Sequence, residues 1–124
     1  RQGVVSSERD SPLGFKQQLM ACRREGVATT WMVIVITKTP ETVCVCFPPI
    51  KMQPNSTDYY VLVDSHPRPE LGFTGSYALM HSTFDDLVLS LYKIFPPVDL
   101  GQAVSEMMAM MYNAFDLYPL QRLR

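Results

Sequence analysis

Apolar side chains recur at two different spacings along this chain, and the spacings predict its secondary structure. Four segments are rich in β-branched and aromatic residues and are bounded by prolines, glycines or polar turns, which is typical of strands. They cover residues 29–38, 42–47, 59–64 and 76–81. Three further segments repeat apolar residues every three or four positions, which predicts helices with one buried face. These helices are expected to start near residues 11, 82 and 99.

Capping signals support the three predicted helices. Ser11-Pro12 and Gly26 suit the two ends of the first helix, whereas Ser82 and Asp99 suit the starts of the second and the third. Each helix has its own apolar face. The faces consist of Phe15, Leu19 and Cys22 in the first helix, Phe84, Leu87, Val88, Leu91, Tyr92 and Phe95 in the second, and Val104, Met107, Met108, Met111 and Phe115 in the third.

The order of these elements predicts the fold class. One helix, four strands joined by short turns and two further helices are typical of an α+β domain. We therefore expect a mainly antiparallel sheet of about four strands with an N-terminal helix and two C-terminal helices. Residues 1–10 are polar and are expected to form a flexible, frayed N-terminal segment. Residues 11–118 would form the single domain, and residues 119–124 a C-terminal tail.

Composition narrows the classes of function. Apolar residues make up 47% of the 124 residues and charged residues 19%, which suits a folded globule and argues against disorder. The net charge of −1 provides no basic surface for nucleic acid or for an anionic membrane. The longest apolar run, from Trp31 to Ile36, is too short to cross a bilayer. We interpret the chain, which begins at Arg1, as a domain of a longer intracellular protein of the cytoplasm or nucleus.

The three cysteines do not form a disulfide framework. Cys44 and Cys46 lie two residues apart on one strand, where neighbouring side chains on the same face are poorly placed to bond to each other. A zinc site would need four ligands, and only His66 and His81 are left to supplement the cysteines. We expect buried free thiols in a reducing compartment instead, with no metal. No glycine-rich phosphate loop is present, so no cofactor is predicted.

The chemically most informative residues follow the strand at 59–64. Asp64 and His66 are two positions apart, so their side chains are expected on the same side of the chain. A carboxylate in that position orients an imidazole and stabilises its charged form. A purely structural interpretation is also open. In it, Asp64 binds backbone amides at a strand exit and Pro67 ends the ladder.

This region also carries a family resemblance. The run Tyr-Tyr-Val-Leu-Val-Asp-Ser-His-Pro-Arg over 59–68 is followed by Gly72, Gly75, an apolar strand and the run Ser-Thr-Phe-Asp-Asp-Leu over 82–87. Together they resemble the histidine-bearing half of papain-like deubiquitinases, most closely the herpesvirus large-tegument type and its cellular relatives. The resemblance implies a papain-like-derived fold, His66 as general base, Asp64 as its orienting carboxylate, and ubiquitin or a ubiquitin-like protein as the partner.

The expected nucleophile does not fit that pattern. In the family a cysteine sits at a helix N-terminus, where the helix dipole lowers its pKa. Cys22 instead falls near the C-terminal end of the first helix, beside Arg23 and Arg24. We therefore expect a non-catalytic, pseudo-protease-like interaction domain of a larger regulatory or scaffold protein. The alternative is an active ubiquitin or ubiquitin-like cysteine hydrolase, or a fragment of one, with Cys22 as nucleophile.

Two segments are candidates for protein binding. Residues 67–75 form an irregular loop with Arg68, Glu70 and Phe73, and Tyr60 lies on the preceding strand. The last predicted helix has four methionines in five residues, a composition that suits adaptable binding surfaces. Either these methionines belong to the core, or the helix forms a partner or homodimer surface with Met110 exposed.

Overall fold

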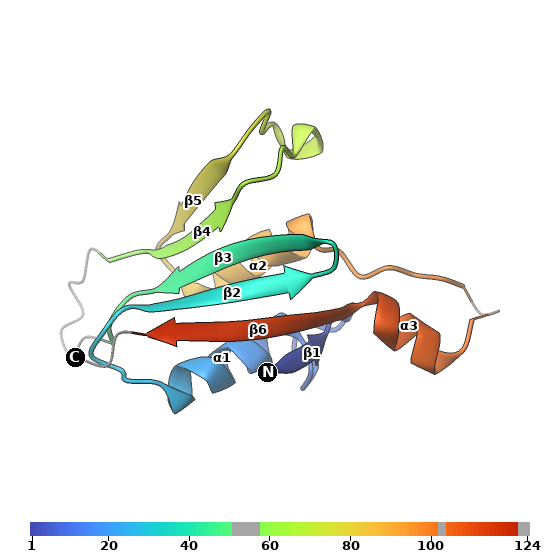
Figure 1. The fold of residues 1–124 in the computed structure, drawn as a ribbon, viewed down its shortest axis with the longest axis horizontal. Helices are drawn as coiled ribbons and strands as arrows, with labels where there is room; N and C mark the ends of the chain where they lie inside the picture. The colour runs from blue at the N-terminus through green and yellow to red at the C-terminus, as the bar shows by residue number, and fades with distance from the viewer. Residues whose placement is uncertain (51–57, 102–103, 122–124) are drawn as a thin grey trace.

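Six strands and two long helices organise the computed structural model, which describes residues 1–50, 58–101 and 104–121 (Figure 1). The elements in chain order are β1 (Gln2–Val4), α1 (Phe15–Glu25), β2 (Met32–Lys38), β3 (Glu41–Phe47), β4 (Tyr60–Asp64), the short 3₁₀ helix η1 (Pro69–Leu71), β5 (Tyr77–His81), α2 (Phe84–Ile94), α3 (Glu106–Tyr112) and β6 (Ala114–Gln121). The predicted α+β class and antiparallel sheet are confirmed.

The predicted number of strands is wrong, because both ends of the chain join the sheet. The strand order is β1-β6-β2-β3-β4-β5, and all pairs are antiparallel. Residues 2–4 form an edge strand although residues 1–10 were expected to be frayed. A side chain at position 3 would collide with the Phe115 ring, since a Cβ there would lie 2.2 Å from it, and glycine permits this close pairing.

The C-terminal part of the chain was also misassigned. Residues 114–121 were expected to end a helix and form a tail, but they make β6, which lies between β1 and β2. Phe115 and Leu117 are buried and alternate with less buried neighbours, which is the period of a strand. Phe115 therefore belongs to the sheet and not to the apolar face of the last helix.

The core lies between the sheet and the two long helices. The stripe predicted for α2 is confirmed, since Leu87, Val88 and Leu91 are buried in the same cluster as alternate residues of the strands. The helix starts one residue later than expected, because Thr83 and not Ser82 is its N-cap and accepts a hydrogen bond from the Asp86 amide. Helix α1 begins at Phe15, later than the Ser11-Pro12 signal suggested, and ends at Gly26 as predicted.

Helix α3 stands apart from the core. Its N-cap is Ser105 and not Asp99, and none of its residues is buried. Met107 and Met111 are 73% and 70% exposed, so of the two alternatives for these methionines the one that places them in the core is wrong. Met110 is also exposed and lines an apolar groove of about 650 Å³ between α3 and β1. None of the helices in the described ranges has the length and apolar character needed to cross a membrane.

Candidate functional site

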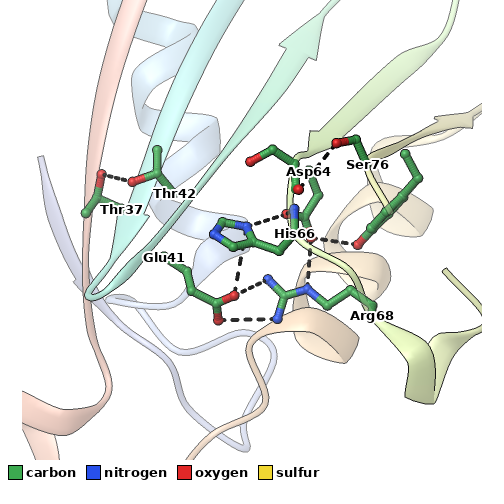
Figure 2. Close-up of polar contacts among 9 residues, drawn as sticks. Thr37, Glu41, Thr42, Asp64, His66, Arg68 and Ser76 are labelled. Carbon is green, nitrogen blue, oxygen red and sulfur yellow. Dashed lines mark hydrogen bonds and ion pairs between the residues drawn. The ribbon is translucent and has the colours of Figure 1, made fainter. Parts of the chain in front are cut away.

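The sheet ends in a polar cluster where the chain leaves β4 (Figure 2). Asp64 is the last residue of β4, and His66 follows after a single serine. The Nδ1 atom of His66 lies 2.7 Å from Oδ1 of Asp64, and the His66 backbone amide donates to the same oxygen at 2.9 Å. The expected pairing of the two side chains is therefore present.

Asp64 is fully buried but well supplied with hydrogen-bond donors. Its second oxygen, Oδ2, accepts from Nε of Arg68 at 2.9 Å and from the Tyr77 hydroxyl at 2.8 Å. Burial alone raises the pKa of a carboxyl group, but the hydrogen bonds from His66, Arg68 and Tyr77 outweigh it and lower the pKa of Asp64 to about 2. The carboxylate is consequently charged at neutral pH and in the whole range where histidine titrates.

Arg68 connects Asp64 to a second carboxylate. Its Nη1 donates to Oε1 of Glu41 at 3.2 Å, and its Nη2 lies 2.8 Å from Oε2 of the same side chain. The guanidinium also lies over the Phe95 ring, at 5.7 Å from the centroid, where α2 ends. Although burial opposes the charged form of Arg68, its bonds to the two carboxylates raise its pKa above the ordinary value.

Arg68 therefore does not occupy the place that the sequence suggested. We expected an exposed contact on the loop, but the residue is only 7% exposed. A buried arginine needs anionic partners, and Asp64 and Glu41 supply them. The sequence did not identify Glu41 as a site residue, and it suggested Tyr77 only as part of an aromatic surface near the site. Tyr77 is the cross-strand partner of Asp64, and Glu41 is the first residue of β3, so both enter the site through strand pairing between distant parts of the sequence.

His66 is held on one side and open on the other. Its Nδ1 faces Asp64 at 2.7 Å, with Oε2 of Glu41 at 3.9 Å, and its side chain is 32% exposed. Within the described part of the chain, Nε2 has no hydrogen-bond partner. Because the charged Asp64 favours a proton on Nδ1, the neutral imidazole presents a free electron pair at Nε2. This is the arrangement that a general base requires.

The loop after His66 is fixed by its own hydrogen bonds. The amide of Arg68 donates to the Phe73 carbonyl at 2.7 Å, and the amide of Phe73 donates back at 2.9 Å. Gly72 has φ 89, a left-handed conformation that suits glycine. The Phe73 ring stacks on Tyr77 with 3.9 Å between centroids, so this part of the loop is tied to the Asp64 cluster. Contacts within the chain therefore hold this loop against the site.

The other predicted binding residues are dispersed. Glu70 is exposed on the loop and Phe73 is partly buried, whereas Met110 lies on α3 at the opposite edge of the sheet. Tyr60 faces the helices and packs against Phe47 at 5.7 Å between ring centroids. Because neighbours on a strand alternate in direction, the preceding Tyr59 is the outward one and is 41% exposed. Tyr60 is therefore partly buried against the core, on the helix side of the sheet.

The three cysteines do not join the Asp64 cluster. Cys22 is 2% exposed in the core, and burial raises its pKa. Cys44 and Cys46 lie on the opposite face of the sheet from Asp64, because Cys44 pairs with Val63, the neighbour of Asp64. Burial also raises the pKa of Cys46. All three are free thiols, as expected, but Cys44 and Cys46 are only partly buried, and burial disfavours the thiolate of Cys22 and of Cys46.

No metal site is formed within residues 1–50, 58–101 and 104–121, where no group of three His, Cys, Asp or Glu residues is suitably placed. His81 is engaged in another contact, since its Nε2 lies 2.8 Å from the Ser90 hydroxyl of α2. No known family model matches this chain, and no curated protein is significantly similar to it. The deubiquitinase resemblance accordingly stays a prediction that residues 59–94 carry.

Proposed function

We propose that this chain carries the general-base half of a papain-like cysteine hydrolase that acts on ubiquitin or ubiquitin-like conjugates. One observation supports the proposal above the others. A buried, charged Asp64 holds Nδ1 of His66 at 2.7 Å, while Nε2 has no partner among the described residues. The substrate class comes from the family resemblance of residues 59–94.

The proposed reaction uses His66 as a proton carrier. A cysteine thiol transfers its proton to Nε2, and the resulting imidazolium is stabilised by Asp64 at Nδ1. The thiolate then attacks the isopeptide carbonyl carbon, and the bond to the lysine amine breaks as His66 returns the proton to that amine. Water, activated by the same histidine, hydrolyses the thioester. Because the three cysteines of this chain lie away from His66, the proposal places the attacking thiol in another segment or molecule.

A second candidate function rests on the same three cysteines. Cys22 is buried in the core, and Cys44 and Cys46 face away from the cluster. This arrangement favours a non-catalytic, pseudo-protease-like domain that binds a ubiquitin-type protein within a larger regulatory or scaffold protein. Both candidates predict ubiquitin binding. They differ in where the ubiquitin C-terminus lies, because only a hydrolase must bring it to His66.

The test is an NMR titration of the chain with ubiquitin that carries a spin label near its C-terminus. For a hydrolase we expect saturable binding and selective broadening of the signals of His66 and of Ser76, whose hydroxyl donates to the carbonyl of the neighbouring Ser65. Ubiquitin without its last two glycines should bind more weakly. Saturable binding without broadening near His66 would favour the non-catalytic candidate. The absence of any shift at near-millimolar concentrations of both proteins would overturn the ubiquitin assignment for both candidates.

A covalent probe provides an independent check on the thiol. Ubiquitin propargylamide reacts with a cysteine that a general base activates. We expect the isolated chain to remain unmodified, because neither face of the sheet brings a cysteine to His66. Modification at Cys22, Cys44 or Cys46, lost in His66→Ala, would show that the nucleophile belongs to this chain and would overturn its proposed placement elsewhere.

A further inference from the structure

The two faces of the sheet differ in how they are covered. Both long helices lie over one face of the sheet (Figure 1). The strand residues on that face form a single buried cluster with residues of α1 and α2. Residues that point the other way form two rows across five neighbouring strands, because cross-strand partners share a face. The first row is Tyr118, Val35, Cys44, Val63 and Ala78. The second row is Leu120, Val33, Cys46, Val61 and Met80.

These ten residues, which we term the open face, have no charged side chain among them. Several are well exposed, including Val63 at 44%, Tyr118 at 53% and Met80 at 64%. An antiparallel sheet with one face in water normally alternates apolar and polar residues. Here the side chains of β2 over Met32–Ile36 are apolar on both faces of the sheet, a composition typical of strands that are covered on both sides. The open face therefore has the composition of an interior layer.

We propose that the open face is the interface with a second copy of this chain. Its extent bears on the partner: five strands about 4.8 Å apart and two rows about 6.8 Å apart give a face of roughly 330 Å² in projection. Side-chain relief raises the accessible area toward about 600 Å² for each partner, the lower end of stable interfaces.

The lack of charge also permits pairing with a second copy. A two-fold axis places the same patch against itself, and like charges on such a patch would repel each other. The two rows avoid this penalty because every residue in them is uncharged, and the carboxylate of Asp116 lies beyond them, opposite Thr37. Interfaces between identical subunits are more apolar than transient ones, and the open face fits that class.

The proposed dimer leaves the Asp64 cluster accessible. Asp64 points to the helix side of the sheet, because Val63 on the open face is its neighbour on the strand. Association through the open face and chemistry at His66 therefore use opposite sides of the sheet. The dimer proposal stands independently of the proposed function.

The main test is the mass of the chain in solution, measured by sedimentation equilibrium over a hundredfold range of concentration. We expect a dimer for the unmodified chain and a monomer for Val63→Lys and for Tyr118→Lys. Both positions are already about half exposed, so the substituted chains should fold, and far-UV circular dichroism checks this. The matched control is Met111→Lys, which adds the same charge at a position that is 70% exposed on α3. The control should remain a dimer.

Cysteine alkylation provides a second readout at the open face. Cys44 and Cys46 lie in the middle of the two rows, whereas Cys22 is buried in the core of each copy. Their reaction with iodoacetamide should slow at least severalfold as concentration rises, and Val63→Lys should abolish this protection. The reaction of Cys22 should not depend on concentration.

Three outcomes would overturn the proposal. One is a monomeric unmodified chain at several hundred micromolar. The second is a dimer that Val63→Lys and Tyr118→Lys leave intact. The third is a dimer that Met111→Lys dissociates, which would move the interface to the methionine-rich helix.

Discussion

Asp64 is the residue on which the polar cluster depends. It is inaccessible to solvent, yet it remains charged because His66, Arg68 and Tyr77 donate hydrogen bonds to it. Arg68 in turn is buried in its charged form, because the carboxylates of Asp64 and Glu41 balance its charge. A buried charge that loses a partner is strongly destabilising, so each member of the cluster constrains the others.

The pKa of Asp64 predicts an acid-dependent stability. The pKa is about 2 in the folded chain, compared with an ordinary value of 3.8. Since the folded value is depressed, the stabilisation is complete above the unfolded pKa and is lost as pH falls through the folded one. We expect the unfolding free energy to drop by about 2 kcal/mol between roughly pH 5 and pH 1.

Urea denaturation at several pH values measures this loss. In Asp64→Asn the contribution of this carboxylate is gone, and the buried Arg68 keeps Glu41 but loses its partner at Nε, which should lower the stability at neutral pH by about 3 kcal/mol. Its stability should then vary less with pH than that of the unmodified chain. An equal acid dependence in both chains would mean that other carboxylates are responsible.

Asp64 also predicts the tautomer of His66. At pH values where the imidazole is neutral, the proton should reside on Nδ1, because that atom lies 2.7 Å from a charged carboxylate oxygen. Two-dimensional ¹⁵N–¹H spectra of the imidazole distinguish the tautomers. His81 serves as an internal reference, since it faces a hydroxyl and not a carboxylate. A proton on Nε2 of His66 would remove the acceptor that the proposed reaction needs.

At the scale of elements, features that depend on residue spacing within one segment were predicted better than features that depend on pairing between distant segments. The stripe of α2 and the adjacent Asp64 and His66 were predictable because each depends on a spacing within one segment. Strand β1 has only three residues, and its stability comes from pairing with β6 at the other end of the chain. Glu41 joins the site in the same way, through the distant Arg68.

The misassignment around α3 has a more specific cause. Phe115 fits both a helical stripe from Val104 and an alternating strand pattern with Leu117. Spacing alone therefore did not distinguish a helix from a strand at this position. The helix in fact ends at Tyr112, and the Asn113 side chain bonds to the Val98 carbonyl and to the Ala109 carbonyl. These bonds, one of them to a distant residue, mark the boundary between α3 and β6.

The caps of α2 and α3 should respond differently to the same substitution. Ser105 accepts from the Met108 amide and Thr83 from the Asp86 amide. Each cap contributes about 1 kcal/mol. Helix α3 buries no residue, so Ser105→Ala should fray it with little effect on global stability. Helix α2 is packed in the core, so Thr83→Ala should lower global stability by about 1 kcal/mol while the helix persists.

Amide hydrogen exchange and urea denaturation separate the two effects. Exchange of the amides at Met110 and Met111 should accelerate in Ser105→Ala, with an unchanged urea midpoint. In Thr83→Ala the midpoint should fall. A matching fall in both variants would indicate that α3 is coupled to the core.

At the scale of the whole molecule, aromatic rings connect the first helix to the last strand and to the polar cluster. Phe15 is completely buried and stacks on Phe115 of β6 at 4.4 Å between centroids. It also lies 6.3 Å from the Phe95 ring, which in turn contacts Arg68. Phe15 thus packs between elements that are far apart in the sequence.

Replacing this ring tests whether the core positions the site. Phe15→Leu should lower the unfolding free energy by about 1 to 2 kcal/mol, because it leaves a gap among Phe115, Phe95 and Tyr92. Leu13→Ala is the control, since Leu13 is 44% exposed and its truncation should cost little. The His66 tautomer signal should persist in folded Phe15→Leu, because the bonds to Asp64 come from β5 and from the residues just after β4. Loss of that signal in a folded protein would instead mean that a change in aromatic packing at Phe15 alters the site through Phe95 and Arg68.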